Sequence, residues 1–369
     1  MRHPWVFSGG IAKTKNIDEQ TVMVEVIAND GNKLGYGFWD ADSQISVRLF
    51  EFGKAKSDFD PKFWKHRLHK AYSLRKSLLP PKTNMYRLVF SEGDGMPGLI
   101  VDVYHDLASV QLLAEFANEY LTALDEFLPE IGVKDYYLKN NQTAKNHGAN
   151  PFDKWRFNAK GHEKVIALEN GNSFEVDIEN GQKTGFFIDQ RDNRALLGEL
   201  SKEKTVLNTF SFSGGFSIYA LANQAQKVVS VDVSKPANQS CTINQNLNHE
   251  IITADCFDFL KKETEKFDLV ILDPPAFAKN SKAVSQAARG YKELNMSGLN
   301  RVREGGFLFT FSCSQHIDKL LFQKIVFSAA ADVRKNVRIV KWLSQPFDHP
   351  VNIYHPEGEY LKGLLLYVD

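Results

Sequence analysis

Alternation of apolar and polar positions near the start of the chain predicts a small antiparallel β domain. Valines occupy every second position of residues 22–26, and Asn-Asp-Gly-Asn at residues 29–32 is a hairpin-turn sequence. Segments 34–39 and 45–49 supply further strand patterns. We therefore expect β structure over about residues 5–50.

A helical pattern follows this β region. Asp60 before Pro61 is a typical helix start, and Pro80 stops the pattern. The residues between them that recur at helical spacing are Trp64, Leu68, Ala71, Arg75 and Leu78. We expect one helix here, which links two domains.

The middle of the chain mixes short strand patterns with one helical segment at residues 115–127, as expected for a β-rich α+β domain. A polar stretch at residues 140–160 predicts a loop, and Asp189 is a plausible helix start. The expected strands are residues 87–90, 99–104, 109–113, 136–138 and 174–178.

Beyond Val206, strand and helix patterns alternate, which predicts an α/β fold with a doubly wound parallel sheet. An apolar strand from Val206 runs into a Gly-Gly turn and then a helix, and Asp232 ends the next strand. A third buried strand ends in Asp273, followed by two prolines. The carboxyl ends of such strands form one edge of the sheet, where ligands bind.

These residues favour a nucleotide-like ligand. The glycines allow close approach of the backbone, and the acid after the second strand is placed to accept bonds from ribose hydroxyls. We expect Asp232 to hold the ribose, Asp255 the adenine amino group, and Asp273 to face the substrate. Alternatively, Asp232 and Asp255 are helix caps or turn residues. The candidate cofactor contacts are Asn208, Phe210, Ser211, Gly214, Gly215, Asp232, Asp255, Asp273 and Pro274.

The signals together suggest an S-adenosylmethionine methyltransferase more than a dehydrogenase. The glycine turn lacks the G-x-G-x-x-G spacing of dinucleotide-binding folds, and Asp-Pro-Pro follows the third strand.

Cys313 ends an apolar strand one strand beyond Asp273. A lone strand cysteine usually serves packing, but both residues would open on the same edge. A cysteine at this edge would suit methylation of carbon 5 of cytosine. That carbon is a poor nucleophile, and thiolate attack at carbon 6 activates it. Asp273 would then contact the base at N3. Cys241 and Cys256 lack this setting, and we expect them to be small core residues.

The composition is that of an ordinary globular protein, with 369 residues, 43% hydrophobic and 24% charged. No stretch approaches ~18 consecutive apolar residues, so we expect no membrane span. The start lacks the apolar segment of a secretory signal, and the three cysteines have no metal-ligand spacing. We expect a cytoplasmic protein without a metal site.

The charges balance, with 45 basic and 45 acidic residues, but they are unevenly distributed. Residues 61–90 hold eight Lys or Arg and no Asp or Glu. This run is either a solvated helix face or a patch that contacts RNA phosphates. For the second case the candidates are Lys65, Arg67, Lys70 and Arg75.

Several long stretches make the chain resemble the bacterial 23S ribosomal RNA cytosine-5 methyltransferases called large-subunit methyltransferase I. They include His-Pro-Trp at residues 3–5 and Gly-Gln-Lys-Thr-Gly at residues 181–185. All matching stretches are residues 3–8, 92–99, 179–191, 210–216, 273–275, 289–292, 311–314 and 355–358.

The resemblance implies a PUA-like RNA-binding domain over residues 1–60, a linker helix and central α+β domain over 61–178, and a class I methyltransferase domain over 179–369. Family members usually have a strand before the His-Pro-Trp segment with which this chain begins, so either the native start lies further upstream or the PUA-like barrel is without its first strand. The implied partner is 23S ribosomal RNA.

The resemblance also implies site residues. Cys313 is the nucleophile, and the residues that border the S-adenosylmethionine are Gln182, Lys183, Thr184, Asp189 and Arg191. Ala276 follows Asp-Pro-Pro where related lineages place a second cysteine. The group that removes the carbon 5 proton is therefore open.

Two other functions fit parts of the sequence. Asp-Pro-Pro is similar to the motif of amino-group or guanine-N7 RNA methyltransferases, although the aromatic Phe277 stands one place late. A non-catalytic RNA-binding assembly factor is the second alternative, against which the intact Gly214, Asp232 and Cys313 count. The oligomeric state is open, with a homodimer as one option.

Overall fold

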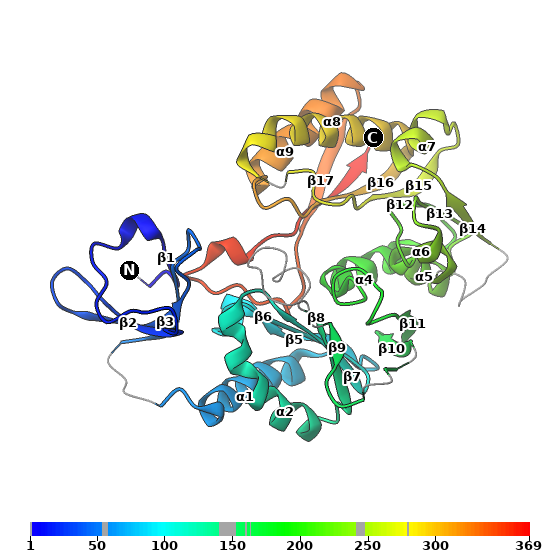
Figure 1. Cartoon of the computed structure of the whole chain (residues 1–369). Coiled ribbons are helices and arrows are strands. Elements are labelled where there is room, and N and C mark those ends of the chain that lie inside the picture. The colour runs from blue at the N-terminus through cyan, green and yellow to red at the C-terminus, as the bar shows by residue number, and fades with distance from the viewer. Residues whose placement is uncertain are drawn as a thin grey trace. The chain divides into compact units, whose positions relative to one another are not determined.

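The computed structural model describes residues 2–53, 58–139, 153–158, 161–162, 164–240, 248–278 and 280–369. It divides into two compact units, here called unit 1 (residues 1–188 and 347–358) and unit 2 (residues 189–346 and 359–369). Figure 1 shows the helices and strands, coloured by residue number along the chain. Most of the loop predicted at residues 140–160, and Cys241, lie outside the described residues.

Unit 1 begins with an antiparallel sheet in the order β1-β4-β3-β2. The predicted hairpin at residues 29–32 is confirmed. Asp30 accepts a 3.0 Å hydrogen bond from the N–H of Asn32, and Gly31 takes a left-handed conformation (φ 82°). The strands are β1 (Trp5–Val6), β2 (Met23–Ile27), β3 (Lys33–Trp39) and β4 (Val47–Phe52).

Helix α1 (Pro61–Leu78) forms where the sequence predicts it. The carboxylate of Asp60 caps it by accepting the N–H of Phe63 at 3.0 Å. The helix buries Trp64, Leu68, Ala71 and Arg75, the predicted positions except Leu78.

The central sheet of unit 1 has the order β5-β6-β7-β8-β9. The helix predicted at residues 115–127 is divided into a 3-10 turn, η3 (Glu115–Tyr120), and α2 (Leu121–Glu130). The strands are β5 (Met85–Phe90), β6 (Leu99–Tyr104), β7 (Leu107–Leu112), β8 (Asp135–Lys139) and β9 (Lys154–Trp155), and the turn η2 (Ser91–Asp94) follows β5.

One apolar core joins the two sheets of unit 1 through α1. Phe38 of β3 packs against Trp64 of α1 and Phe116 of η3, with ring centroids 5.6 and 4.6 Å apart. Helix α1 therefore lies inside a common core rather than between two separately packed domains. A hairpin of β10 (Val165–Glu169) and β11 (Asn172–Val176) completes the unit, and the first of its strands was not predicted.

Unit 2 contains, among the described residues, a seven-stranded sheet in the order β14-β13-β12-β15-β16-β18-β17. Numbered from β12 along the chain, this order is 3-2-1-4-5-7-6. Strand β18 runs antiparallel to both neighbours. The strands are β12 (Thr205–Thr209), β13 (Lys227–Asp232), β14 (His249–Thr253), β15 (Phe267–Leu272), β16 (Val302–Ser312), β17 (Val337–Leu343) and β18 (Lys362–Val368).

Helices cover both faces of this sheet, as a doubly wound fold requires (Figure 1). Leu308 of β16 packs with α7, α8 and α9, whereas its neighbour Phe309 packs with α4 and α5 on the opposite face. The predicted α/β fold class is thus confirmed. The helices are α4 (Arg191–Leu200), α5 (Gly215–Ala222), α6 (Lys235–Ser240), α7 (Cys256–Lys262), α8 (Val284–Arg301) and α9 (Lys319–Asp332).

Residues 347–358, expected in the methyltransferase domain, belong to unit 1. Buried polar bonds hold them there. Asp348 accepts the backbone N–H of Arg87 at 3.0 Å, and its carbonyl accepts from the guanidinium of Arg75 at 2.9 Å. The turn η7 (Pro356–Gly358) ends the segment before the chain returns to unit 2.

Candidate cofactor and substrate site

The sheet of unit 2 has a topological switch point beside β12. This strand pairs in parallel with β13 on one side and β15 on the other, and the two neighbours continue the chain in opposite directions across the sheet. In open α/β sheets, ligands bind in the crevice at the carboxyl ends of such strands. The predicted candidates Asp232 and Asp273 both lie at this edge, because each follows or ends a parallel strand.

The loop between β12 and α5 has a constrained backbone. Phe210, Phe212 and Gly214 take left-handed conformations, with φ of 56°, 47° and 74°. Such conformations are costly for residues with side chains, and they persist where surrounding bonds enforce them. Here the N–H of Phe210 donates to Cys256 Sγ at 3.2 Å and that of Phe212 to Asp232 Oδ2 at 2.8 Å. The loop is thereby fixed to the start of α7 and the end of β13.

Two buried polar atoms of this region fit a polar ligand. Asn208 donates through Nδ2 to Ser217 at 2.8 Å, but its Oδ1 has no hydrogen-bond partner among the described residues. The hydroxyl of Ser211 in the loop is likewise buried and without a partner in the described part of the chain. Buried polar groups are normally satisfied, so a ligand with donors and acceptors suits this position.

Asp232 and Asp255 both support the local backbone. Asp232 accepts the N–H groups of Phe212 and Ser234, each at 2.8 Å, and Asp255 caps α7 by accepting the N–H of Asp258 at 3.0 Å. The turn and cap roles that the sequence left open are therefore present. An ionised carboxylate has about four acceptor positions, so these bonds leave capacity for ribose and adenine contacts.

Cys313 and Asp273 follow neighbouring parallel strands and lie at the same edge. Strand β15 pairs with β16 so that Leu272 stands opposite Thr310. The Sγ of Cys313, which is partly exposed, lies 4.0 Å from the carbonyl oxygen of Pro274. The end of β16 thus meets the Asp-Pro-Pro segment directly.

Ser314 fastens these two segments together. Its hydroxyl accepts the N–H of Ala278 at 3.2 Å and shares a 2.9 Å hydrogen bond with Tyr291 of α8. The ring of Phe277 lies 4.5 Å from that of Tyr291, between centroids. Burial raises the pKa of the Tyr291 phenol, so this group is neutral.

Lys362, the first residue of β18, is a buried cation that the sequence did not reveal. The residue is 4% exposed, and Nζ donates to the carbonyls of Ser314 and Tyr360, each at 2.7 Å. Burial lowers the pKa of Lys362 to about 8, while the charge of Cys313 opposes this shift. No local sequence pattern could have identified Lys362. Antiparallel pairing of β18 with β16 brings it near Cys313, which lies 49 positions earlier in the chain.

Cys256 is a core residue, as expected. Its Sγ lies 3.4 Å from the carbonyl of Val231, and burial raises the pKa of its thiol to about 12. It therefore does not ionise at neutral pH.

The residues of the Gln182 to Thr184 stretch lie in unit 1. Thr184 is fully buried and donates to Asp102 at 2.6 Å. Lys183 places its ammonium 4.2 Å from the ring centroid of Phe187. A cofactor contact of this stretch stays a prediction.

Asp189 and Arg191, also predicted to border the cofactor, lie in unit 2 and are buried. Asp189 accepts a 2.6 Å hydrogen bond from the phenol of Tyr360, and Arg191 is the first residue of α4. Their role toward the cofactor stays a prediction.

Several of the basic candidates for RNA contact have structural partners. Arg75 is fully buried and forms two bonds to Asp94, at 2.5 and 2.7 Å, so its guanidinium is not at the surface. Arg67 pairs with Glu51 at 2.7 Å, and Lys65 pairs with acids of α2. Of the predicted four, Lys70 is the exposed one. Helical spacing indicated the burial of Arg75, because it placed this residue with the apolar residues of the helix.

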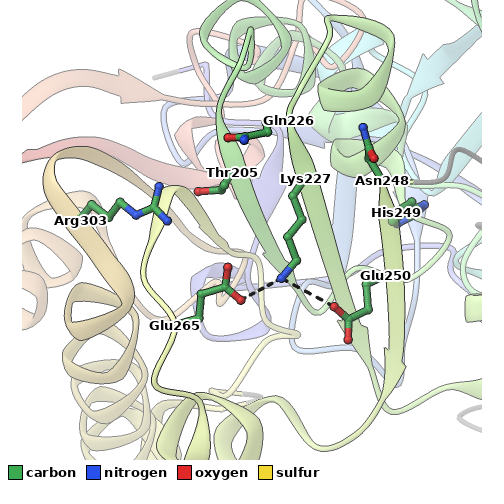
Figure 2. A pocket seen from close by; sticks show the side chains of 8 residues that line it. All are labelled: Thr205, Gln226, Lys227, Asn248, His249, Glu250, Glu265 and Arg303. Atoms are coloured by element: carbon green, nitrogen blue, oxygen red, sulfur yellow. Dashed lines mark hydrogen bonds and ion pairs between the residues drawn. The ribbon is translucent and has the colours of Figure 1, made fainter.

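A surface pocket of about 540 Å³ lies at the opposite edge of the sheet, at the amino ends of the strands (Figure 2). The ammonium of Lys227 lies between the carboxylates of Glu265, at 2.8 Å, and Glu250, at 3.9 Å. The charges of this pocket therefore compensate one another. Ligands of doubly wound sheets bind at the carboxyl ends, and we assign the chemistry to that edge.

Comparison with known families agrees with this geometry. Residues 154–317 match the family described as S-adenosylmethionine-dependent methyltransferase, and residues 1–52 match a PUA-like domain. A SAM-dependent methyltransferase of Streptococcus mutans shares the fold, with a TM-score of 0.83 and 23% identity over 99% of this chain and 95% of that one. A methyltransferase solved with SAH has a TM-score of 0.82 and 24% identity over 99% and 96%.

The protein is therefore an S-adenosylmethionine-dependent methyltransferase with an N-terminal PUA-like domain. It is 39% identical to ribosomal RNA large subunit methyltransferase I of Alteromonas mediterranea, over 99% of this chain and 94% of the relative. The enzyme of that name from Aeromonas salmonicida is 40% identical, over 99% and 95%. The chain belongs to the large subunit methyltransferase I family, which confirms the resemblance found in its sequence.

Within the described residues, no helix is long and apolar enough to cross a membrane, and no group of His, Cys, Asp or Glu side chains could hold a metal ion.

Proposed function

We propose that the protein methylates carbon 5 of a cytosine in 23S ribosomal RNA, through a covalent adduct with Cys313. The observation that carries the proposal is the position of a partly exposed thiol against the Asp-Pro-Pro segment at the ligand edge of the sheet. The relatives at 39–40% identity are named for ribosomal RNA of the large subunit, which supports the substrate. A protein that methylates ribosomal RNA is expected to act in the cytoplasm.

The thiolate of Cys313 forms a bond to carbon 6 of the cytosine, and the electron pair of the 5,6 double bond moves so that carbon 5 becomes nucleophilic. Asp273, in its protonated form, donates a hydrogen bond to N3 of the base and stabilises the negative charge that develops there. Bound S-adenosylmethionine would supply the methyl group to carbon 5, and breaking its sulfur–methyl bond would release S-adenosylhomocysteine. Loss of the carbon 5 proton to a base then expels the thiolate and restores the ring.

The cofactor is held by the loop between β12 and α5 and by the ends of β13 and β14. Asp232 accepts bonds from the ribose hydroxyls, and Asp255 accepts from the adenine amino group. The amide of Asn208 and the hydroxyl of Ser211 supply the buried polar atoms that the protein leaves unbonded within the described chain. Gly214 and Gly215 allow the backbone to approach the ligand closely.

RNA docks on the exposed lysines of α1. Lys62, Lys70 and Lys76 are exposed along this helix, whereas Arg67 and Arg75 are used inside the fold. Clustered lysines bind phosphates through their charge, without reading sequence. The base to be methylated must leave its stack to reach Cys313.

The test is analysis of the product. Purified protein is incubated with S-adenosylmethionine and unmodified 23S ribosomal RNA, and the RNA is digested to nucleosides for mass spectrometry. We expect 5-methylcytidine. An N-methylated nucleoside would favour the amino-group or guanine-N7 reaction, and cofactor binding without any product would favour an assembly factor.

A further inference from the structure

We propose that Lys362 is the positioning residue that keeps Cys313 in its reactive thiolate form. The inference rests on the proposed role of Cys313 as the nucleophile, and it names the cation that this role requires.

The backbone places Lys362 beside Cys313 from both sides. In the sheet, Lys362 is paired with Ser312, the residue just before the cysteine. Its ammonium donates at 2.7 Å to the carbonyl of Ser314, the residue just after. A second 2.7 Å bond to the carbonyl of Tyr360 fixes the lysine side chain against the residues just before β18. The ammonium is therefore held against the backbone of the residues that flank Cys313.

Burial makes this cation sensitive to a nearby anion. The pKa of Lys362 is lowered to about 8 by burial, and the first of the groups that oppose the lowering is Cys313. Below pH 8 the lysine is mainly charged, so it carries its charge at neutral pH. A buried ammonium gains more from a neighbouring thiolate than an exposed one would, since water screens it less.

The other ionisable groups around Lys362 have further partners. Glu359 pairs with Lys319 at 2.5 Å, and Asp318 caps α9 by accepting the N–H of Leu321 at 2.7 Å. The Tyr291 phenol on α8 is neutral because burial raises its pKa. The thiolate of Cys313 thus remains as an anion that Lys362 can stabilise.

Only the thiolate attacks carbon 6, and a cation next to a thiol lowers the pKa at which it forms. Each pKa unit changes the thiolate fraction tenfold below that pKa. Cys256 shows the opposite environment, where burial raises the thiol pKa to about 12.

The experiment measures alkylation of Cys313 by iodoacetamide against pH, with mass spectrometry of the peptide that contains it. The variants are Lys362→Gln, which keeps donors without the charge, and Lys362→Arg, which keeps the charge. Lys335→Gln is the matched control, because Lys335 also donates to two carbonyls, those of Leu299 in α8 and of Val302 at the far end of β16. Cofactor affinity by calorimetry reports correct folding.

We expect Lys362→Gln to slow alkylation at pH 7 by about tenfold or more and to raise its midpoint by about one pH unit or more. Lys362→Arg should restore most of the rate, and Lys335→Gln should match the wild type. An unchanged midpoint in folded Lys362→Gln overturns the proposal. Equal loss in the Gln and Arg variants also overturns it, since packing and not charge would then matter.

The wild-type profile is a second test that needs no variant. A midpoint at or above about 8.5, the ordinary thiol value, overturns the proposal even if neither variant folds. The alkylation assay contains no RNA, so it is independent of the proposed function. If Cys313→Ala still methylates RNA, the proposed function fails whatever the alkylation profile shows.

Discussion

The backbone N–H of Phe212 donates a 2.8 Å hydrogen bond to the carboxylate of Asp232. Phe212 has a left-handed conformation (φ 47°), so this bond helps to hold a strained loop in shape. The residue expected to bind the cofactor ribose therefore also shapes the loop that approaches the cofactor. Binding and loop geometry are linked through one carboxylate.

Replacing Asp232 with Ala should weaken S-adenosylmethionine binding by about 1–3 kcal/mol, the cost of leaving bonded partners unsatisfied. Calorimetry measures the affinity. Asp268→Ala is the control, because Asp268 also accepts a backbone N–H, from Thr205 at 2.8 Å, but at the opposite edge of the sheet. Unchanged affinity in Asp232→Ala would show that Asp232 does not bind the cofactor.

Replacing Cys313 with Ala should abolish methyl transfer while cofactor affinity is retained, because only the covalent step is lost. Cys256→Ala should keep measurable transfer, since that thiol is buried and un-ionised. RNA with 5-fluorocytosine at the target should trap the wild type, but not Cys313→Ala, as a covalent complex on a denaturing gel. Methylation by the Ala variant would exclude the adduct.

Changing Lys62, Lys70 and Lys76 together to Ala should weaken RNA binding and flatten its dependence on salt. Each lost phosphate contact should reduce the slope of log affinity against log salt by about 0.7–0.9. Lys65→Ala is the control, because Lys65 is paired with Glu126 and Glu130. Filter binding at several salt concentrations measures the slopes. Equal slopes in the wild type and the triple variant would show that these lysines form a solvated helix face and do not contact RNA.

Local patterns explain what the sequence predicted well. Helix α1 begins at its expected cap, Asp60, and β13 ends at Asp232 as expected, because caps and strand ends depend on neighbours in the chain. The common edge of Asp273 and Cys313 followed from the rule that parallel strands point their carboxyl ends the same way.

Distant pairings explain what was missed. Lys362 lies beside the Cys313 segment only because β18 is inserted antiparallel between β16 and β17. No residue near Lys362 in the sequence indicates that register. Asp348 joins unit 1 through bonds to Arg75 and Arg87, more than 250 positions earlier. Within the basic run, charge alone could not show that Arg75 is buried, since a sequence does not show whether a buried acid such as Asp94 compensates it.

The buried ion pair of Arg75 and Asp94 should contribute to the free energy of unfolding of unit 1. Asp94 accepts two bonds from the guanidinium and a third, at 2.6 Å, from the N–H of Phe90. Removing one partner of a buried pair leaves the other charge uncompensated, which costs about 3–5 kcal/mol. We expect Arg75→Met to lower the free energy of unfolding of unit 1 by about this amount, measured by urea denaturation.

Lys65→Met is the control for this loss. Its pairs with Glu126 and Glu130 are exposed to water, so the free energy of unfolding should change by no more than about 1 kcal/mol. A similarly small effect of Arg75→Met would mean that the pair does not stabilise the core of unit 1.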